Sequence, residues 1–550
     1  MRSNGKKFTG VSLLFLLSVA SLAAPTGDLR LVEAVKNKDQ ERVGLLLQQQ
    51  VAVNSPEPDG ATALAWAAHW DDLETAERLI GAGADPNLAN DYGVTPLSLA
   101  CSNASAAMVE KLLKAGAKAN VAQWSGETPL MTCGRRGAVE AVKSLLAHGA
   151  NVNAQTRRGQ TALMWAAGEK RSEVVRALLD RGADVNASTH LPDGFKPLEH
   201  LDYGLYDHVS GTPDHHDATK VHLDPASSRG DYTALLFAAR SGDLDSAKML
   251  VAAGAKVNLA GPDGPPLLVA SASGNEAVAI YLLDKGADPN AVDGYGIAAL
   301  HWATQEGLAE ITAAKIDAPT DHLWYHPNMP QLVKALLAHG ANVNARIAKG
   351  TPPWDYPPFA HGGGIALPQI RQVGATAFFL AAARADIDLM RTLLAAGADP
   401  RLATEEGTTP LMAAAGLGAK GPRSPAERKN ALDAVRLAVE LGNDVNAVAA
   451  GGRTALHGAA YTGANETIQF LVERGANLNA KDKYGQTPLS IASGDPERLV
   501  DPFDKRFKQQ PAPHKDTAEL LLKLGATPLS AEAVKVGATK VAAPSRYPSQ

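Results

Sequence analysis

A short motif, Gly-Ala-x-x-Asn, recurs along this chain and constrains its fold more than any other feature. The glycines of four successive copies, Gly83, Gly116, Gly149 and Gly182, are each 33 residues apart. A period of this size is typical of arrays of one supersecondary unit, which is too small to bury its own apolar face and must stack on its neighbours. Although the chain has 550 residues, we therefore expect its folded part to be one stacked array rather than several globular domains. Further copies, some slightly altered, begin at Gly254, Gly286, Gly340, Gly397, Gly442, Gly475 and Gly525.

Residues 127–159 show what one unit contains. The Thr-Pro-Leu that opens the unit predicts the start of a helix, because proline is tolerated in the first helical turn, where its missing N–H would have no partner. A break at Gly137 precedes a second helix, whose apolar residues recur at helical spacing. Gly149 then stands where a helix end favours a left-handed residue. Each unit is therefore predicted to be a pair of short helices followed by a turn.

The 33-residue period, the Thr-Pro-Leu or Thr-Ala-Leu heads and the Gly-Ala-Asp-x-Asn tails together resemble the ankyrin repeat family. The resemblance covers roughly residues 28–528 and implies an all-α solenoid of about twelve helix-turn-helix repeats with irregular loop insertions. The head of that family is usually Thr-Pro-Leu-His, and only His301 and His457 keep the histidine. We expect the fold to survive this departure but the local hydrogen bond of the histidine to be lost elsewhere. The residues that replace it include Ala65, Met131, Met164, Leu236 and Met412.

The first 23 residues are not expected to belong to the fold. Basic residues precede an apolar run at 11–19, and small residues surround a cleavage point near Ala23, as in a secretory signal peptide. The apolar run is too short to span a bilayer comfortably. Removal of three positive charges with this segment changes the formal net charge from −5 to −8. We expect an acidic protein that is secreted or periplasmic, and the short signal with few cysteines is compatible with a bacterial source.

Irregular motif spacing divides the array into segments. Two of its inserts interrupt the turn side of the repeats and three interrupt the helix–helix side, and long loops in a compact array are often functional. The expected segments are 1–23 (signal peptide), 24–60 (N-terminal capping repeat), 61–187 (repeats), 188–231 (histidine-rich insert), 232–346 (repeats, with an insert at 312–330), 347–374 (an insert rich in proline, glycine and aromatic residues), 375–528 (repeats, with inserts at 418–430 and 495–515) and 529–550 (a disordered tail).

The chain has two cysteines, Cys101 and Cys133, on the first helices of adjacent predicted repeats. Neighbouring helices pack about 8–10 Å apart, whereas a disulfide usually requires Cα atoms about 4.4–6.8 Å apart. This geometry favours two small buried thiols, although an oxidising compartment would permit a disulfide.

The insert at 188–231 contains six of the fifteen histidines, with aspartates interleaved. Imidazole and carboxylate ligands together suit zinc or copper. The usual ligand spacings, such as His-Glu-x-x-His or a cysteine pair, are missing from the insert, so a polar surface loop is the favoured interpretation and no cofactor is expected. If the insert does bind an ion, its ligands are expected to be His208, His215, His216 and His222.

Aromatic residues occur in two repeating places. Those at the predicted turn tips project into solvent, where Tyr and Trp are typical anchors for a protein partner, and simple packing of the turn is the alternative. The tip residues are Tyr92, Trp124, Tyr295 and Tyr484. A second set shares one position, two residues after the head leucine, where the resembling family has core leucines, so packing is favoured over a ligand platform. This set is Trp66, Trp165, Phe237 and Trp302.

Three pairs of basic residues fall on two successive repeats, after first helices and at a turn tip. The resemblance places both locations on the concave groove of an ankyrin array, so a basic surface on an acidic chain is expected to meet an acidic partner. Ordinary solvated charge is the alternative. The residues are Arg135, Arg136, Arg157, Arg158, Lys170 and Arg171. We expect Arg135, Arg136, Lys170 and Arg171 to be exposed rather than packed, with Arg157 and Arg158 projecting beside them.

The sequence offers little support for catalysis. It contains no nucleophile elbow, phosphate-binding glycine loop or Cys-x-x-Cys-His haem motif, so no catalytic residues are expected. The favoured function is an extracytoplasmic scaffold, not membrane-embedded and not bound to nucleic acid, that recognises a partner protein through its concave groove and turn fingers. An enzyme, or a protein that binds a small ligand or metal in a pocket built from the histidine- and aromatic-rich inserts, is the alternative. A purely structural spacer is less favoured, because it would not need such varied inserts.

Overall fold

The computed structural model describes residues 28–190, 231–294, 296–304, 326–349, 373–419, 423–483, 485–494 and 513–528. Within these ranges the chain forms 24 helices and no strand, with three isolated bridges between turns. The predicted all-α fold of stacked repeats is thereby confirmed. The segments 1–23 and 529–550, expected to be a signal peptide and a tail, lie outside the described residues.

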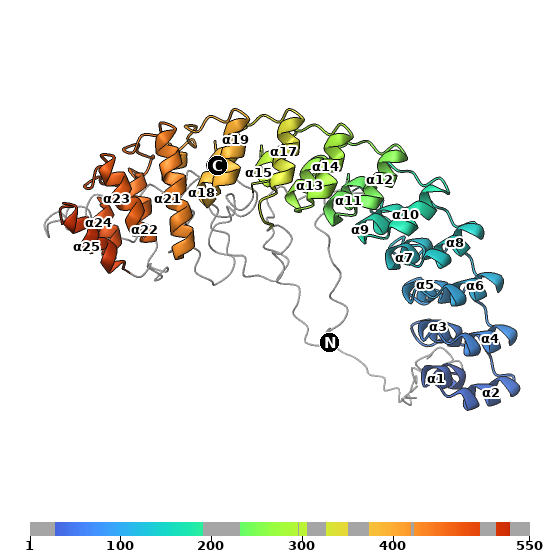
Figure 1. Cartoon of the computed structure of the whole chain (residues 1–550). Helices are drawn as coiled ribbons and strands as arrows, with labels where there is room; N and C mark the ends of the chain where they lie inside the picture. Colours follow the sequence, from blue (N-terminus) through green and yellow to red (C-terminus); the bar gives the residue numbers. More distant parts are fainter. Residues whose placement is uncertain are drawn as a thin grey trace, which may run out of the picture. The chain divides into compact units, whose positions relative to one another are not determined.

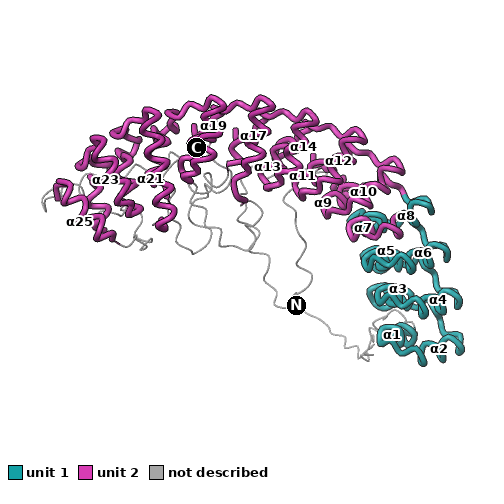
Figure 2. Tube along the Cα trace, in the orientation of Figure 1, with its two compact units in different colours: residues 1–132, 143–150 teal, residues 133–142, 151–550 magenta. Residues whose placement is uncertain are grey.

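The chain divides into two compact units (Figure 2). Unit 1 comprises residues 1–132 and 143–150, and unit 2 comprises residues 133–142 and 151–550. The division passes through α7 (Pro129–Arg136) and α8 (Val139–Ala147).

Unit 1 stacks its helices in two layers. The first helices α1, α3 and α5 contact one another in sequence, and the second helices α2, α4 and α6 do the same beside them (Figure 1). Leu79 and Leu112, one repeat apart, are fully buried between the layers. The helices are α1 (Arg30–Lys36), α2 (Gln40–Gln48), α3 (Ala63–His69), α4 (Leu73–Gly81), α5 (Pro96–Ser102) and α6 (Ala106–Lys114).

Unit 2 repeats the same two-layer arrangement (Figure 1). Ser424 and Glu427 form the expected capping box, and α21 begins at Pro425, so residues 425–430, expected in an insert, are helical. The helices are α9 (Ala162–Gly168), α10 (Ser172–Leu179), α11 (Ala234–Ser241), α12 (Leu244–Ala252), α13 (Pro266–Ala272), α14 (Glu276–Asp284), α15 (Ala299–Trp302), α17 (Pro330–Ala338), α18 (Ala377–Arg384), α19 (Ile387–Ala395), α20 (Pro410–Ala414), α21 (Pro425–Glu440), α22 (Ala455–Thr462), α23 (Asn465–Glu473), α24 (Pro488–Ala492) and α25 (Lys515–Lys523).

Side-chain caps define where the short helices begin. Thr95 Oγ1 accepts a hydrogen bond from the Ser98 N–H (3.2 Å) at the start of α5, and Asp72 Oδ1 accepts from the Thr75 N–H (3.0 Å) at the start of α4. Each cap satisfies one of the N–H groups that a helix start leaves without a partner. The second helices end before a glycine of positive φ, +90° at Gly83, where a Cβ would have nothing within 4 Å. Backbone conformation, and not lack of space, therefore requires glycine there.

The motif asparagines join each repeat to the next through both ends of the side-chain amide. Asn87 Nδ2 donates to the Gly116 carbonyl (3.0 Å), and its Oδ1 accepts from the Lys118 N–H (2.8 Å). A primary amide can do this because it carries a donor and an acceptor a short distance apart. The same pair of bonds is made by Asn54 in unit 1 and by Asn153, Asn186, Asn258, Asn290, Asn344 and Asn446 in unit 2.

These asparagine bridges continue across the inserts of unit 2. Asn186 Nδ2 donates to the Gly254 carbonyl (3.0 Å), 68 residues later in the chain. The ends of this insert are held together, since the Thr189 N–H donates to the Tyr232 carbonyl (3.0 Å) and the Asp231 N–H donates back to Thr189 (2.6 Å). The repeats on either side therefore stack directly on each other.

One junction in unit 2 reverses the direction of the bridge. Arg401 stands where the other repeats have the bridging asparagine, and Asn443 stands after Gly442 where they have alanine. Asn443 is buried, and its Nδ2 donates backwards to the Pro400 carbonyl (3.1 Å). The asparagine lost from one repeat is thus compensated by an asparagine gained in the next.

This reversal predicts a non-additive stability effect. Asn443→Ala, although it installs the residue common to other repeats, should lower the free energy of unfolding by about 1 kcal/mol, because a buried bridging hydrogen bond is lost. Adding Arg401→Asn should restore the stability, because the usual bridge can then form. Urea titration measures both variants, and a double variant no more stable than Asn443→Ala would contradict the compensation.

Both cysteines are fully buried and disulfide-bonded. The favoured expectation of two free thiols is therefore wrong. The expectation relied on the distance between helix axes, which overestimates the separation of residues on facing sides of two helices.

Candidate protein-binding surface

Backbone hydrogen bonds hold the turn fingers of successive repeats together. In unit 1 the Asp91 N–H donates to the Asp59 carbonyl (2.8 Å), and the Trp124 N–H donates to the Tyr92 carbonyl (3.2 Å). In unit 2 the His190 N–H donates to the Arg158 carbonyl (2.9 Å). The tips are thus preordered, so their side chains are presented on a fixed backbone.

Unit 1 presents exposed aromatic residues. Tyr92 is 61% and Trp124 is 64% exposed, as predicted for turn tips. Tyr295 and Tyr484, predicted to serve the same purpose, lie outside the described residues. A further exposed aromatic residue, Trp70, was not predicted from the sequence; it is 40% exposed at the end of α3. The four-residue spacing of Trp66 and Trp70 places them one helical turn apart, and this spacing could have identified Trp70 from the sequence.

The aromatic residues of α3 form a cluster with nearby lysines. The His69 ring lies 5.5 Å from Trp66 and 4.7 Å from Trp70, measured between ring centroids. Lys36 Nζ lies 4.5 Å from the Trp66 centroid, and Lys38 Nζ lies 4.3 Å from the Trp70 centroid. These are cation–π distances, so lysine covers part of each indole face.

The six predicted basic residues all belong to unit 2. We call them the basic cluster: Arg135, Arg136, Arg157, Arg158, Lys170 and Arg171. Arg136, Arg157, Lys170 and Arg171 are exposed, whereas Arg135 and Arg158 are half-buried.

Arg135 was expected to be exposed to solvent, but it is packed against a tryptophan. Its guanidinium carbon lies 5.1 Å from the centroid of the Trp165 ring, and this packing accounts for its partial burial. Arg171 Nε donates to the Arg135 carbonyl (3.3 Å), and the Arg171 side chain passes over Gly137, where a Cβ would meet its Cδ at 2.8 Å. Contacts within unit 2 therefore fix the two arginines relative to each other.

The four aromatic residues that stand two positions after the head leucine differ in their burial. Phe237 (9% exposed) and Trp302 (4%) are buried, as the packing interpretation predicts. Trp66 and Trp165 are only half-buried, and each has a cation over its ring. Packing alone is therefore the wrong description of these two tryptophans.

The two head histidines link adjacent repeats. His301 Nδ1 accepts from the Ala298 N–H (3.0 Å), while its Nε2 lies 3.0 Å from the Ala345 carbonyl in the next repeat. Where histidine is replaced, the first of these bonds is not always lost as expected. Met131 Sδ accepts from the Thr128 N–H at 3.5 Å. A soft sulfur acceptor can thus partly substitute for the imidazole.

Burial lowers the pKa of the His301 imidazole to about 4 and lowers the pKa of His457 as well. The charged form is disfavoured because the buried ring cannot be solvated. In the unfolded chain a histidine titrates near its ordinary value of about 6.5, so unfolded protein binds more protons between pH 6.5 and 4.

Stability should therefore fall as the pH falls from about 6.5 to 4, with His301 contributing about 3 kcal/mol of the loss. His301→Met, which installs the residue of other repeats, should flatten this slope in urea titrations at several pH values. Leu236→Met, at the same head position of another repeat, changes no titratable group, so it serves as the control and should leave the slope unchanged. An unchanged slope in His301→Met would refute the burial argument.

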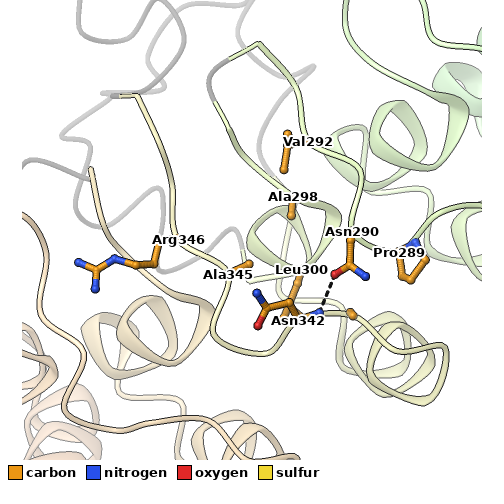
Figure 3. Close-up of a pocket in the computed structure, with 9 residues that line it drawn as sticks. Pro289, Asn290, Val292, Ala298, Leu300, Asn342, Ala345 and Arg346 are labelled. Carbon is orange, nitrogen blue, oxygen red and sulfur yellow. Dashed lines mark hydrogen bonds between the residues drawn. The ribbon is translucent and has the colours of Figure 1, made fainter.

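A shallow recess of about 340 Å³ lies beside one asparagine bridge of unit 2 (Figure 3). Its lining includes Leu300 and the two asparagines Asn290 and Asn342, which are joined by the hydrogen bond from the Asn342 N–H to Asn290 Oδ1 (2.7 Å). Among the described residues of the lining, Arg346 alone has an ionisable side chain, and its Nη2 donates to the Ala403 carbonyl (2.7 Å). These described residues provide no pair of groups for acid–base chemistry.

No group of three or more histidine, cysteine, aspartate or glutamate side chains that could hold a metal occurs in the described part of the chain. The predicted ligands His208, His215, His216 and His222 lie outside that part. No helix among the described residues is long and apolar enough to cross a membrane.

Comparison with known proteins decides the family. The family described as ankyrin repeats (3 copies) matches residues 31–123, 107–189, 235–316 and 426–501, which together cover more than half of the chain. The chain belongs to the ankyrin-repeat family. Ankyrin repeats generally mediate protein–protein interaction, and this property of the family supports a protein-binding role for the chain.

Several curated relatives are similar to parts of this chain. Ankyrin repeat and SOCS box protein 16 of Homo sapiens is 34% identical over 239 residues, which is 41% of this chain and 47% of that protein. Neurogenic locus notch homolog protein 1 of Homo sapiens is 34% identical over 156 residues, 24% of this chain and 6% of that protein. E3 ubiquitin-protein ligase KEG of Arabidopsis thaliana is 26% identical over 297 residues, 52% of this chain and 17% of that protein. The chain therefore spans less than half the length of these relatives.

Proposed function

We propose that this ankyrin-repeat protein is an extracytoplasmic scaffold that binds an acidic protein partner through the basic cluster of unit 2. The observation that carries the proposal is the concentration of six cationic side chains within two repeats of a chain whose formal net charge is negative. A local positive surface attracts acidic partners and orients them during encounter.

The surroundings of the basic cluster support binding without large rearrangement. The Arg171 bond to the Arg135 carbonyl and the finger hydrogen bond from His190 to Arg158 fix the backbone that carries the cations. Little conformational entropy is then lost when a partner docks. The exposed aromatic tips Tyr92 and Trp124 of unit 1 offer further anchors of the type common at protein interfaces.

The extracytoplasmic location rests on the signal-like sequence at residues 1–23, and N-terminal sequencing of the exported protein tests whether cleavage falls near Ala23. Compartment and partner are separate parts of the proposal. A scaffold retained with its first 23 residues would contradict the location and leave the binding surface unaffected.

Charge reversal at two exposed positions tests the binding surface. The double variant Arg136→Glu with Lys170→Glu should retain the melting temperature of the wild type within about 2 °C, because exposed charges contribute little to stability. Capture of the partner from the native extracytoplasmic fraction should fall at least about tenfold, and salt should weaken the wild-type complex.

The matched control reverses Arg176, which lies on the second helix α10, and Arg181, which comes just after it; both are also exposed in unit 2. This control should capture the partner as well as the wild type does. Nuclease treatment distinguishes a protein partner, whose capture survives it, from a nucleic acid. Equal capture by the wild type and by the Arg136/Lys170 variant would place the binding site elsewhere.

A further inference from the structure

The cation–tryptophan pair occurs twice, at equivalent repeat positions. Lys36 covers Trp66 in unit 1, and Arg135 covers Trp165 in unit 2. Both members of the second pair follow those of the first by 99 residues, which is three repeats of 33. The same local arrangement can therefore be compared in two places of one chain.

In unit 1 a carboxylate completes this arrangement. Trp66 Nε1 donates to Glu57 Oε2 (2.6 Å), while Lys36 Nζ pairs with Glu57 Oε1 (3.0 Å). Glu57 is half-buried and thus joins the indole N–H and the ammonium group in one charge-assisted network. Every polar group of this triad has a partner.

In unit 2 the carboxylate is missing from the equivalent position. Thr156 stands 99 residues after Glu57. Its short side chain accepts hydrogen bonds from the N–H groups of Arg158 (3.3 Å) and Gln160 (3.1 Å) within the finger. Trp165 Nε1 is buried and has no hydrogen-bond partner. A buried donor without an acceptor is unfavourable and calls for an explanation.

We propose that an aspartate or glutamate side chain of the partner supplies this carboxylate, accepting from Trp165 Nε1 and pairing with Arg135 as Glu57 pairs with Trp66 and Lys36. This inference rests on the proposed function, since it assigns one specific contact to the acidic partner. The Trp165 side chain is half-buried but its Nε1 is buried, so we expect a carboxylate to reach this N–H only when the Arg135 side chain, which lies over the ring, turns towards the carboxylate. Arginine suits this position because its planar fork can bind a carboxylate through two N–H groups.

A labelled oligo-glutamate peptide provides a probe that does not require the natural partner. Its affinity for the full-length protein is measured by fluorescence anisotropy at low salt. Trp165→Phe keeps an aromatic ring, as Phe237 does at the equivalent position of the next repeat, but removes the N–H. We expect it to bind the peptide about tenfold more weakly, the effect of one hydrogen bond to a charged group.

Trp66→Phe is the matched control. It removes the same N–H where Glu57 already occupies the acceptor position, so peptide affinity should equal that of the wild type. A second comparison adds the missing carboxylate within the chain. Thr156→Glu should weaken peptide binding more than Gln155→Glu, which makes the same charge change at the neighbouring exposed position.

The outcomes separate this inference from the proposed function. Suppose that the wild type and Trp165→Phe bind the peptide equally well, whereas the Arg136/Lys170 reversal binds it weakly. This result would overturn the carboxylate site but leave the basic cluster as the binding surface, and an ordered water would then be the acceptor for Trp165 Nε1. Failure of the wild type to bind the peptide at all would overturn both. Weaker binding by Trp165→Phe than by Trp66→Phe, together with weaker binding by Thr156→Glu than by Gln155→Glu, would support the inference.

Discussion

The asparagine that follows each Gly-Ala motif makes the interaction on which the rest of this structure depends. Each helix is too short to be stable alone, and the ends of such helices leave carbonyl groups without partners. The asparagine amide satisfies a carbonyl after the next second helix and orders the following turn, so it fixes one repeat against another. At Asn87 this takes one side chain and two hydrogen bonds of 3.0 and 2.8 Å. The interaction is local, so inserts do not disturb it when their ends are held together.

The same regular backbone presents the functional side chains. A stacked array gives every first helix and every finger an equivalent position, and side chains outside the core then differ from repeat to repeat. In this chain those differences place exposed aromatic residues on unit 1 and the basic cluster on unit 2. In one repeat, Glu57 provides a carboxylate to both Lys36 and Trp66. At the equivalent position of another repeat Thr156 provides none, and the Nε1 of Trp165 is buried without an acceptor.

Sequence reasoning predicted the features that depend on neighbouring residues. The helix pairs, the glycine conformations and the Ser424–Glu427 capping box follow from periodicity and capping rules and agree with the structure. The features it missed depend on side chains that meet across repeats. The stacking of Arg135 on Trp165 and the backward bridge of Asn443 each join residues at least 30 positions apart, and a single-repeat pattern does not contain that information. Aligning the repeats with each other would have revealed that Lys36–Trp66 and Arg135–Trp165 are equivalent pairs.

Amide hydrogen exchange at two lysines tests most directly whether the asparagine bridges form one continuous stack across an insert. The exposed Lys118 donates its N–H to Asn87 Oδ1 (2.8 Å) at a regular junction, and the equivalent Lys256 donates to Asn186 Oδ1 (3.0 Å) across the insert between residues 190 and 231. Selective 15N-lysine labelling allows both amides to be followed by NMR in the same sample. The account predicts slow exchange of similar protection at both sites, because both protons are held by the same bridge. Exchange of Lys256 at the rate of an unstructured chain, with Lys118 protected, would show that the stack is interrupted there and would contradict the account.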